Sequence, residues 1–331
     1  IVFCAGMLAA LLALVFPAGA VALAWLLSWP VRLVWLLVRG AAGLPFAALY
    51  LDNGYHITAA VFLYALALLL ALHPKSVRFR HAAAAAVLVT ACCMGLSCAD
   101  YAMSGRSFSM LDVGQGQCLV YRTGNSISVI DCGGQEDASG ETAARFLLAR
   151  GVTRVDRLIL THFDADHCNG VRQLLNRIRI GTLYVPELSP ESRLRTKLLF
   201  AAARTGTDIQ FVTDDLTLPD GVTLFAPITD AEEANAGLCV LAEDEKYDIL
   251  ITGDLPAQAE YRLLSTHALR RTAVLVAGHH GAASSTSETL LRVTQPEAVL
   301  ISVGADNRFG HPAGETLARI ADTGAAVYRT D

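Results

Sequence analysis

Long apolar runs dominate the first hundred residues of the chain. Residues 4–29 carry no charged side chain and consist mainly of Ala, Leu and Val, and two further uncharged runs cover residues 57–72 and 82–98. An α-helix needs about 20 predominantly apolar residues to cross the hydrocarbon core of a bilayer. We therefore expect three transmembrane α-helices, whereas residues 30–45, in which two arginines lie among leucines and valines, are typical of a helix in the membrane interface.

Beyond the first hundred residues the pattern changes to short apolar segments separated by turn residues. Alternating positions at 107–113, 118–123 and 127–131, with glycine-containing turns between them, predict a meander of strands. Further along, predicted strands alternate with helical segments such as 141–150 and 191–204. This order is typical of an α+β domain in which two sheets pack face to face with helices outside.

The distribution of charge divides the chain at the same place. Residues 1–100 carry five Lys/Arg and two Asp/Glu, a net charge of +3, whereas residues 101–331 carry 21 Lys/Arg and 29 Asp/Glu, a net charge of −8. We predict transmembrane and interfacial helices at 1–100 and a second domain at 101–331. Because basic loops stay on the cytoplasmic side, Lys75, Arg78 and Arg80 predict that the second domain faces outward.

The segment 161–170, which reads THFDADHCNG, concentrates more metal-binding side chains than any other part of the chain. It places His162, Asp164, Asp166 and His167 within six residues, directly after a short apolar segment that predicts a strand. Imidazole and carboxylate groups suit zinc, manganese and iron. The segment therefore predicts a hydrolytic metal site.

Further acidic and histidine side chains occur where other predicted strands end. They are Asp131, Asp254, the pair His279 and His280, and His311. Loops that follow strands are where sheet scaffolds usually place binding residues. Each residue alone has an ordinary explanation, since an Asp beside Gly is usually a turn former. Their order along the chain is more specific than any one of them.

In this order the residues resemble the metallo-β-lactamase superfamily, and the resemblance covers essentially all of residues 107–331. It implies a metallo-β-lactamase-like αββα sandwich with two divalent metal ions at one edge. The segments 111–116 (LDVGQG), 161–170, 279–281 (HHG) and 310–312 (GHP) are more narrowly similar to the C-terminal domain of the ComEC family of DNA-internalisation competence proteins. In that family a transmembrane region precedes this domain. The resemblance implies a multi-pass protein of the bacterial cell membrane, with DNA, membrane lipid and other competence proteins as partners.

Four positions depart from the pattern expected of the family. Gln117 stands where an Asp usually follows DVGQG, Val276 where Lys is frequent, and Leu238 and Ala282 where Ser is frequent. These departures predict either reduced activity or a divergent branch. Because the chain begins with Ile rather than Met, we also expect further residues before it.

The resemblance also implies a set of metal ligands. The set is His162, Asp164, Asp166, His167, Asp254 and His279, although whether His279 or His280 is the ligand stays open. Asp164 replaces the second His of the commoner HxHxDH motif, and no His occurs between His167 and His267. Harder oxygen ligands shift the preference toward manganese, with zinc still possible. Asp254 is expected to bridge the two ions.

Catalytic and supporting roles follow from the same resemblance. Asp166 is expected to orient the attacking water, and His280 or His311 to protonate the leaving oxygen or to hold a phosphate. Residues expected to support the ligands from behind are Asp131, Asn235, Ser285 and Asn307.

These observations predict a metal-dependent phosphodiesterase, a nuclease that hydrolyses DNA outside the membrane, with the non-transported strand as the implied substrate. The net charge of −8 opposes DNA binding, but basic residues between 172 and 204 supply a local patch, with Arg193, Arg195 and Lys197 as expected contacts. Two alternatives stay open. One is a superfamily hydrolase of another ester, lactone or phosphoester, and the other is a catalytically degenerate domain that guides DNA to a membrane channel.

Overall fold

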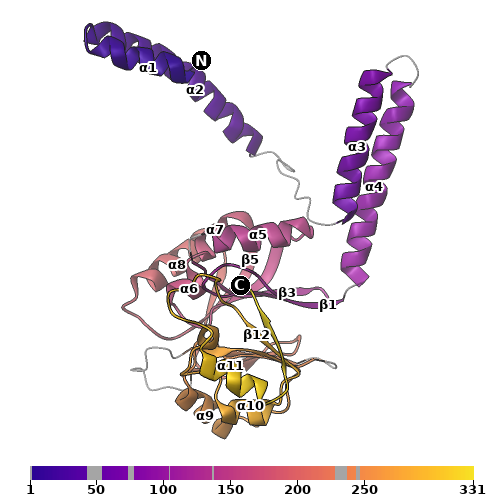
Figure 1. The fold of residues 1–331 in the computed structure, drawn as a ribbon, viewed down its shortest axis with the longest axis vertical. Coiled ribbons are helices and arrows are strands. Elements are labelled where there is room, and N and C mark those ends of the chain that lie inside the picture. Colours follow the sequence, from indigo (N-terminus) through magenta and orange to yellow (C-terminus); the bar gives the residue numbers. More distant parts are fainter. Residues whose placement is uncertain are drawn as a thin grey trace. The chain divides into compact units, whose positions relative to one another are not determined.

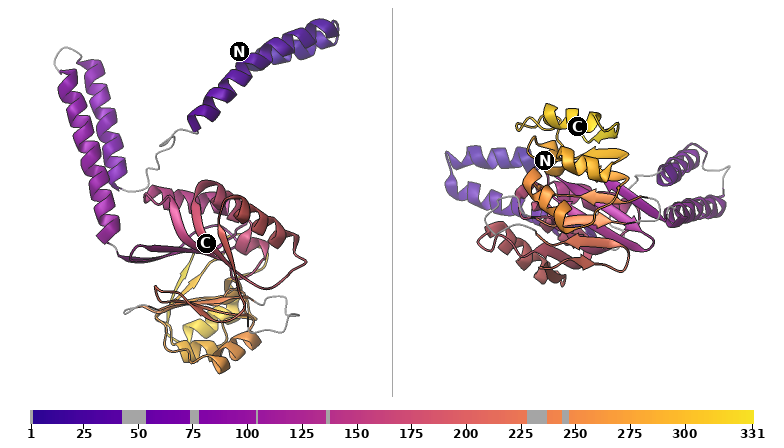
Figure 2. Two further views of the ribbon diagram at one scale, coloured as in Figure 1. Left: turned by 180° about the vertical axis from the view of Figure 1, so that it is seen from behind. Right: turned by 90° about the horizontal axis from the view of Figure 1, so that it is seen from below.

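The structure is a computed structural model that describes residues 2–42, 54–73, 78–103, 105–135, 138–227, 237–243 and 247–331. The chain divides into two compact units, residues 1–51 and residues 52–331, and each is described by itself (Figures 1 and 2).

Two apolar helices make up the described part of the first unit. Helix α1 (Val2–Ala13) packs against helix α2 (Pro17–Ala42) after a short turn. The prediction of a single helix over residues 4–29 is therefore wrong. Pro17 begins the second helix, because proline lacks the N–H that a continuing helix needs and suits the first helical position.

The predicted interfacial helix at 30–45 is also wrong as a separate element. Pro30 lies inside α2, so residues 30–42 continue the same helix, and residues 43–45 lie outside the described residues. Transmembrane helices tolerate an internal proline when neighbouring groups satisfy the freed backbone carbonyl. Arg39 stacks over the ring of Trp35 at 4.8 Å, a contact that suits the level of the lipid headgroups.

Three helices in the described part of the chain are long and apolar enough to cross a membrane. They cover Pro17–Ala41 in α2, Gly54–Leu72 in α3, and Phe79–Asp100 in α4 (Phe79–Met103). Helices α3 and α4 lie side by side (Figure 1). Three spans were expected, but the first begins at Pro17 instead of residue 4.

The first sheet of the second unit has six strands in the order β1-β2-β3-β4-β5-β6. They are β1 (Arg106–Met110), β2 (Cys118–Thr123), β3 (Ser126–Cys132), β4 (Arg154–Ile159), β5 (Arg179–Pro186) and β6 (Asp208–Val212). Strands β1 to β3 pair antiparallel, as the meander predicted, and β3 to β6 pair parallel. The carboxyl ends of β3 and β4 therefore lie at one edge.

The second sheet has seven strands in the order β13-β12-β11-β10-β9-β8-β7. They are β7 (Leu216–Thr217), β8 (Val222–Phe225), β9 (Cys239–Ala242), β10 (Ile249–Ile251), β11 (Val274–Val276), β12 (Ala298–Ile301) and β13 (Ala326–Arg329). Strands β10 to β13 pair parallel and the others antiparallel. The carboxyl ends of β10, β11 and β12 therefore also share an edge.

Helices cover the outer face of each sheet (Figure 2). Over the first sheet lie α5 (Ser139–Ala149), α7 (Val171–Arg177) and α8 (Arg193–Arg204), and over the second lie α9 (Ala257–Thr266), α10 (Glu288–Thr294) and α11 (Gly314–Ala321). Helix α8 begins two residues later than the predicted segment 191–204, because the Ser192 hydroxyl accepts a hydrogen bond from Arg195 N.

Strand alternation produces three apolar layers. Leu158 of β4 faces the helices of the first sheet, and its neighbour Ile159 lies in the layer between the two sheets with Leu224 of β8 and Ile251 of β10. A third layer joins the second sheet to its helices. The predicted α+β sandwich with helices outside is confirmed.

Candidate metal centre

The candidate site residues come from five chain segments, each at the carboxyl end of a strand. Asp131 lies near the end of β3, and His162 follows β4. Asp254, His280 and His311 follow β10, β11 and β12 respectively. Because parallel strands end together, both sheets deliver these loops to one edge of the sandwich.

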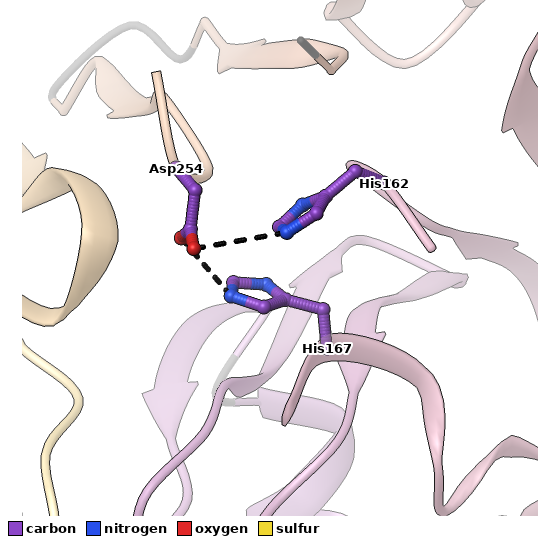
Figure 3. A group of neighbouring side chains, drawn as sticks. All are labelled: His162, His167 and Asp254. Carbon is purple, nitrogen blue, oxygen red and sulfur yellow. Dashed lines mark ion pairs between the residues drawn. The ribbon is translucent and has the colours of Figure 1, made fainter. Parts of the chain in front are cut away.

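Two histidines and an aspartate form the first group of possible ligands. Figure 3 shows the side chains of His162 and His167 pointing toward the carboxylate of Asp254. His167 Nε2 lies 3.0 Å from Asp254 Oδ1, and His162 Nε2 lies 3.7 Å from Asp254 Oδ2. All three residues are buried, and one ligand atom from each lies within 4.8 Å of the others.

A second group shares His167 with the first. It consists of Asp166, His167 and His280, whose ligand atoms also lie within 4.8 Å of one another. His280 Nε2 is 3.3 Å from Asp166 Oδ2, and His280 Nδ1 is 2.8 Å from the Ser302 carbonyl oxygen. A carbonyl can only accept, so Nδ1 carries the proton and the Nε2 lone pair points into the group.

Unsatisfied buried atoms show that these groups fit divalent metal ions. His162 Nε2 and His280 Nε2 are buried and make no hydrogen bond within the described part of the chain, whereas His167 Nε2 and Asp254 Oδ1 face each other as an ion pair at 3.0 Å. A buried polar atom without a partner is destabilising, so each such atom needs an explanation. Imidazole nitrogens and a carboxylate that converge in this way have the chemistry of a metal site.

Asp131 fixes the orientation of His167 from behind. Its Oδ2 accepts from His167 Nδ1, Gln117 Nε2 and the Thr161 hydroxyl, each at 2.8 Å, while Oδ1 accepts from Thr161 N at 2.8 Å. Because His167 uses Nδ1 as the donor, its Nε2 lone pair points toward Asp254. The supporting role expected of Asp131 matches this geometry.

Thr161 extends the same control to His162. Its hydroxyl proton goes to Asp131, so its oxygen can only accept from His162 Nδ1, which is 3.0 Å away. The proton on Nδ1 leaves the Nε2 lone pair of His162 facing Asp254. One buried carboxylate thus sets the tautomer of two imidazoles. Sequence reasoning missed this role, since nothing in a strand-end threonine distinguishes it from any other.

A close backbone approach explains the glycine that follows Asp131 and Cys132. A Cβ atom on Gly133 would lie 2.2 Å from the carbonyl carbon of Asp166 and 2.3 Å from the His167 nitrogen. Only glycine therefore lets the short helix α6 (Ala165–Cys168) pack against this turn.

The charges of His167 and Asp254 in the first group strongly affect each other's pKa values. Burial opposes protonation of His167, but the attraction of Asp254 and Asp131 outweighs it and raises the pKa of this imidazole well above its ordinary value. Burial also opposes ionisation of Asp254, but His167 and then His162 lower the pKa of its carboxyl well below its usual range. A proton on His167 and a divalent cation therefore compete for the same place.

The structure differs from the sequence-derived ligand set at the histidine pair. Within the described residues, the two groups contain His280, whereas the sequence left the choice between His279 and His280 open, and they do not contain Asp164. His279 and His280 both have positive φ values, 51° and 56°, and their ring planes are inclined by 71° with centroids 6.3 Å apart. His279 Nε2 still lies 3.6 Å from Asp254, and the Asp164 carboxylate, 58% exposed, lies 3.8 Å from His162 Nε2.

The other predicted residues that the structure describes are not members of either group. The rings of His311 and His279 are 5.7 Å apart, and Asn307 exchanges hydrogen bonds with the His311 backbone. Ser285 is fully buried, and its hydroxyl has no hydrogen-bond partner among the described residues. Asn235 lies outside the described residues.

The departures from the family pattern lie outside both groups. Val276 and Leu238 are buried in the apolar layer between the sheets. Gln117 donates its amide to Asp131, and the Ala282 carbonyl accepts from the Thr316 hydroxyl at 2.9 Å. None of these four side chains supplies an atom to the groups identified in the described part of the chain.

Of the basic residues expected to contact DNA, Arg195 and Lys197 have different surroundings. Arg195 pairs with Glu187 at 3.0 Å, and its guanidinium lies 5.2 Å from the ring of Phe211 and 5.8 Å from that of Phe163. Lys197 instead lines a cleft of about 480 Å³ between α7 and α8. The other residues that line this cleft are Arg172, Leu175, Asn176, Phe200, Ala201, Arg204 and Thr205.

Comparisons with known proteins agree with the predicted resemblance. ComE operon protein 3 of Bacillus subtilis (strain 168) is 29% identical over 67% of this chain and 31% of its own length. Competence protein ComA of Neisseria gonorrhoeae is 30% identical over 66% of this chain and 30% of its own length. The resemblance to competence proteins is confirmed, and the chain spans about a third of the length of these curated relatives.

A solved structure and a family description complete the comparison. The metallo-β-lactamase fold protein YhfI from Bacillus subtilis aligns with a TM-score of 0.47 at 12% identity, over 67% of this chain and 96% of that chain. The description "Metallo-beta-lactamase superfamily" matches residues 111–305, which is more than half of the chain and includes every member of both ligand groups. The chain therefore belongs to the metallo-β-lactamase superfamily.

Proposed function

We propose that this chain hydrolyses phosphodiester bonds in DNA with the help of two divalent metal ions. The observation that carries the proposal is the pair of overlapping ligand groups, each of which contains a carboxylate, Asp254 in one and Asp166 in the other. Because Nδ1 of His167 donates to Asp131, its single remaining lone pair can serve only one of the two ions, so the carboxylates and the other histidines would have to complete the second site. Paired divalent ions supply the positive charge that stabilises a phosphoryl transition state and ease the deprotonation of water. The carboxylates favour manganese, and the imidazoles keep zinc possible.

The protein side chains would divide the remaining work. Asp166, 35% exposed at the opening of the second group, is placed to orient the attacking water. His311, at the rim beside His279, is placed to hold a phosphate oxygen or to protonate the leaving oxygen. We assign His280 to metal binding, because its Nε2 converges with Asp166 and His167.

The cleft between α7 and α8 supports a nucleic-acid substrate. Arg172, Lys197 and Arg204 line it, and none of the described residues that line it is acidic. Lys197, Phe200 and Arg204 follow at intervals of three and four, so they share one face of α8. Basic groups with an interleaved aromatic ring suit a single strand, which offers phosphates and unpaired bases. Of the expected contacts Arg193, Arg195 and Lys197, Lys197 lines this cleft.

The membrane region supports a place in DNA uptake. The relatives ComE operon protein 3 and Competence protein ComA, together with three helices able to span a bilayer, fit a membrane protein of this family. Basic residues between the last two spans favour the hydrolase domain at the outer face of a bacterial cell membrane. There it would cut the strand that is not taken up, in contact with lipid and with other competence proteins.

The test uses the full chain in detergent with manganese. His167→Ala and Asp254→Ala should each abolish cleavage of single-stranded DNA and lower the bound metal. The matched controls are His267→Ala and Asp215→Ala, since these two residues form a similar His–Asp pair at 2.7 Å outside the ligand groups. If His167→Ala and Asp254→Ala cut DNA as fast as the two control variants do, the proposal would be refuted.

Two further measurements separate the alternatives. Hydrolysis of nitrocefin but not of bis-p-nitrophenyl phosphate would favour another superfamily substrate. A purified chain that holds no metal and cuts no DNA would favour a guiding domain. Against that outcome stand the buried Nε2 atoms of His162 and His280, which have no hydrogen-bond partner among the described residues.

A further inference from the structure

A series of ring contacts leads from the first ligand group to the protein surface. His279 Nε2 lies 3.6 Å from Asp254 Oδ2, and the ring of His279 is 5.7 Å from that of His311. The ring of Phe309 stacks on His311 with centroids 6.0 Å apart and planes inclined by 14°. Phe309 therefore lies on the rim of the candidate metal centre, next to a side chain assigned to phosphate contact.

Hydrogen bonds hold the loop that carries Phe309. Asn307 Nδ2 donates to the carbonyl oxygens of Gly304 at 2.8 Å and His311 at 2.7 Å, and Asn307 Oδ1 accepts from His311 N at 2.9 Å. The Gly304 nitrogen donates to Gln115 Oε1 at 3.3 Å, which ties the loop to the segment between β1 and β2. A ring on a loop that is already ordered binds a ligand with little further loss of entropy.

Phe309 is exposed in a setting that differs from that of an ordinary surface residue. Its relative exposure is 57%, and isolated exposed apolar side chains need no special explanation. Here, however, the guanidinium of Arg308 lies 5.4 Å from the ring centroid, and the ring borders a hydrolytic site. An exposed aromatic ring beside a cation is the combination with which proteins hold single-stranded nucleic acid.

We propose that Phe309 is a stacking platform for one nucleobase of the substrate strand, with Arg308 contacting a phosphate of the same nucleotide. This inference rests on the proposed phosphodiesterase function and specifies its substrate. In a duplex both faces of a base are covered by its neighbours, so a base that stacks on Phe309 must come from a single or frayed strand. Stacking of this kind tolerates any sequence, because every base has a π face.

The first arm of the test measures binding without cleavage. The full chain in detergent with EDTA is titrated with a single-stranded oligonucleotide that carries 2-aminopurine, whose fluorescence is quenched when the base stacks on a ring. Phe309→Ala should reduce the quenching and weaken binding by about 5-fold to 150-fold, the usual span for one base on one aromatic ring. Phe309→Trp should retain both. Tyr261→Ala, which removes an aromatic ring 65% exposed on α9, is the matched control and should change neither.

The second arm measures cleavage with manganese and abasic substitutions moved along the same oligonucleotide. At one position an abasic site should lower kcat/KM of the wild-type chain by a factor similar to the loss of binding expected for Phe309→Ala. The losses from that abasic site and from Phe309→Ala should not add, because both remove the same contact.

The outcomes separate this inference from the function on which it rests. Additive losses in the cleavage arm, or quenching that survives in Phe309→Ala, would overturn the platform even if DNA is cut. A wild-type chain that cuts no phosphodiester would overturn the proposed function, and the fluorescence arm would still decide whether Phe309 holds a base. Tighter binding of duplex than of single strand would overturn the platform.

Discussion

Replacing Asp131 by Asn tests whether one buried carboxylate orients both imidazoles of the first ligand group. Asp131 is fully buried and accepts hydrogen bonds from Gln117, from His167 and twice from Thr161. Its backbone is left-handed, with φ at 57°. Asn tolerates that conformation as Asp does, so the substitution changes the hydrogen-bond chemistry and keeps the shape.

An amide NH2 in place of Oδ2 would reverse the proton arrangement. His167 Nδ1 would then have to accept, which moves its proton to Nε2 and removes the lone pair that faces Asp254. The Thr161 hydroxyl would also accept from Asn and donate to His162 Nδ1, with the same consequence for that ring. If the amide turned the other way, its NH2 would face the Thr161 nitrogen, a donor against a donor.

The size of the effect follows from these contacts. Each buried donor left without an acceptor costs about 1–3 kcal/mol of stability. Loss of the partner that orients a ligating histidine lowers metal affinity by about 10-fold to 100-fold. Asp131→Asn should therefore lower the free energy of unfolding and weaken metal binding together.

Competition with a fluorescent chelator measures the manganese and zinc affinities of the full chain, and a thermal melt measures stability. Asp156→Asn is the matched control, since Asp156 accepts a single backbone hydrogen bond from Ile127 at 2.8 Å on the same sheet. It should leave metal affinity unchanged. Wild-type metal affinity in Asp131→Asn would refute the reasoning about tautomers.

Three further results are expected. Removing metal with EDTA should stop DNA cleavage and lower the melting temperature, and manganese should restore both, because ligands that bind the folded state stabilise it by about 2.7 kcal/mol at 100 times Kd. Glu260, which accepts from Thr286 N at 2.6 Å and Ser287 N at 2.8 Å, holds the loop after His280, and burial raises the pKa of its carboxyl. Because the pKa of Glu260 is higher in the folded than in the unfolded state, the stability that its protonated carboxyl contributes is fully present below the unfolded pKa and is lost as the pH rises through the folded pKa. The melting temperature of the wild type should therefore fall over that pH window, and the melting temperature of Glu260→Gln should not. Alanine at the three cations of the α7/α8 cleft should reduce the slope of log affinity against log salt by about 2, at about 0.7 per single-strand phosphate contact. The matched control is alanine at the exposed residues Arg270, Arg271 and Arg292.

Periodicity predicted the sandwich well because its strands are regular. In β4, the consecutive apolar residues Leu158 and Ile159 face two different apolar layers, and the sequence shows the short apolar run that is typical of a strand buried on both faces. The two-residue strand β7 and the edge strand β13, all of whose residues are exposed, carry no such signal and were missed. The first transmembrane run failed for a different reason. Its composition is uniform from residue 4 to residue 29, so hydropathy could not show that Pro17 starts a new helix.

The candidate site was predictable as a set of residues but not as a geometry. The order of Asp131, the His/Asp cluster, Asp254 and the later histidines located the loops that meet at one edge. The choice between His279 and His280 depends on two consecutive left-handed residues, a backbone feature that the residue types do not encode. Thr161 was invisible for a similar reason, since its role depends on the direction of one hydroxyl proton.

The departure at Gln117 shows how geometry changes the meaning of a motif letter. Because Gln117 stands where the family usually has Asp, the sequence alone suggests a weakened site. In the structure, however, the Gln117 amide lies 2.8 Å from Asp131 Oδ2, and both side chains are buried. An Asp at this position is one methylene shorter and, when ionised, has no N–H to donate to Asp131 Oδ2. The amide instead adds a donor to the carboxylate that sets both imidazole tautomers. Gln117 therefore keeps a donor on the carboxylate behind the ligands, and this substitution alone is no argument for a degenerate domain.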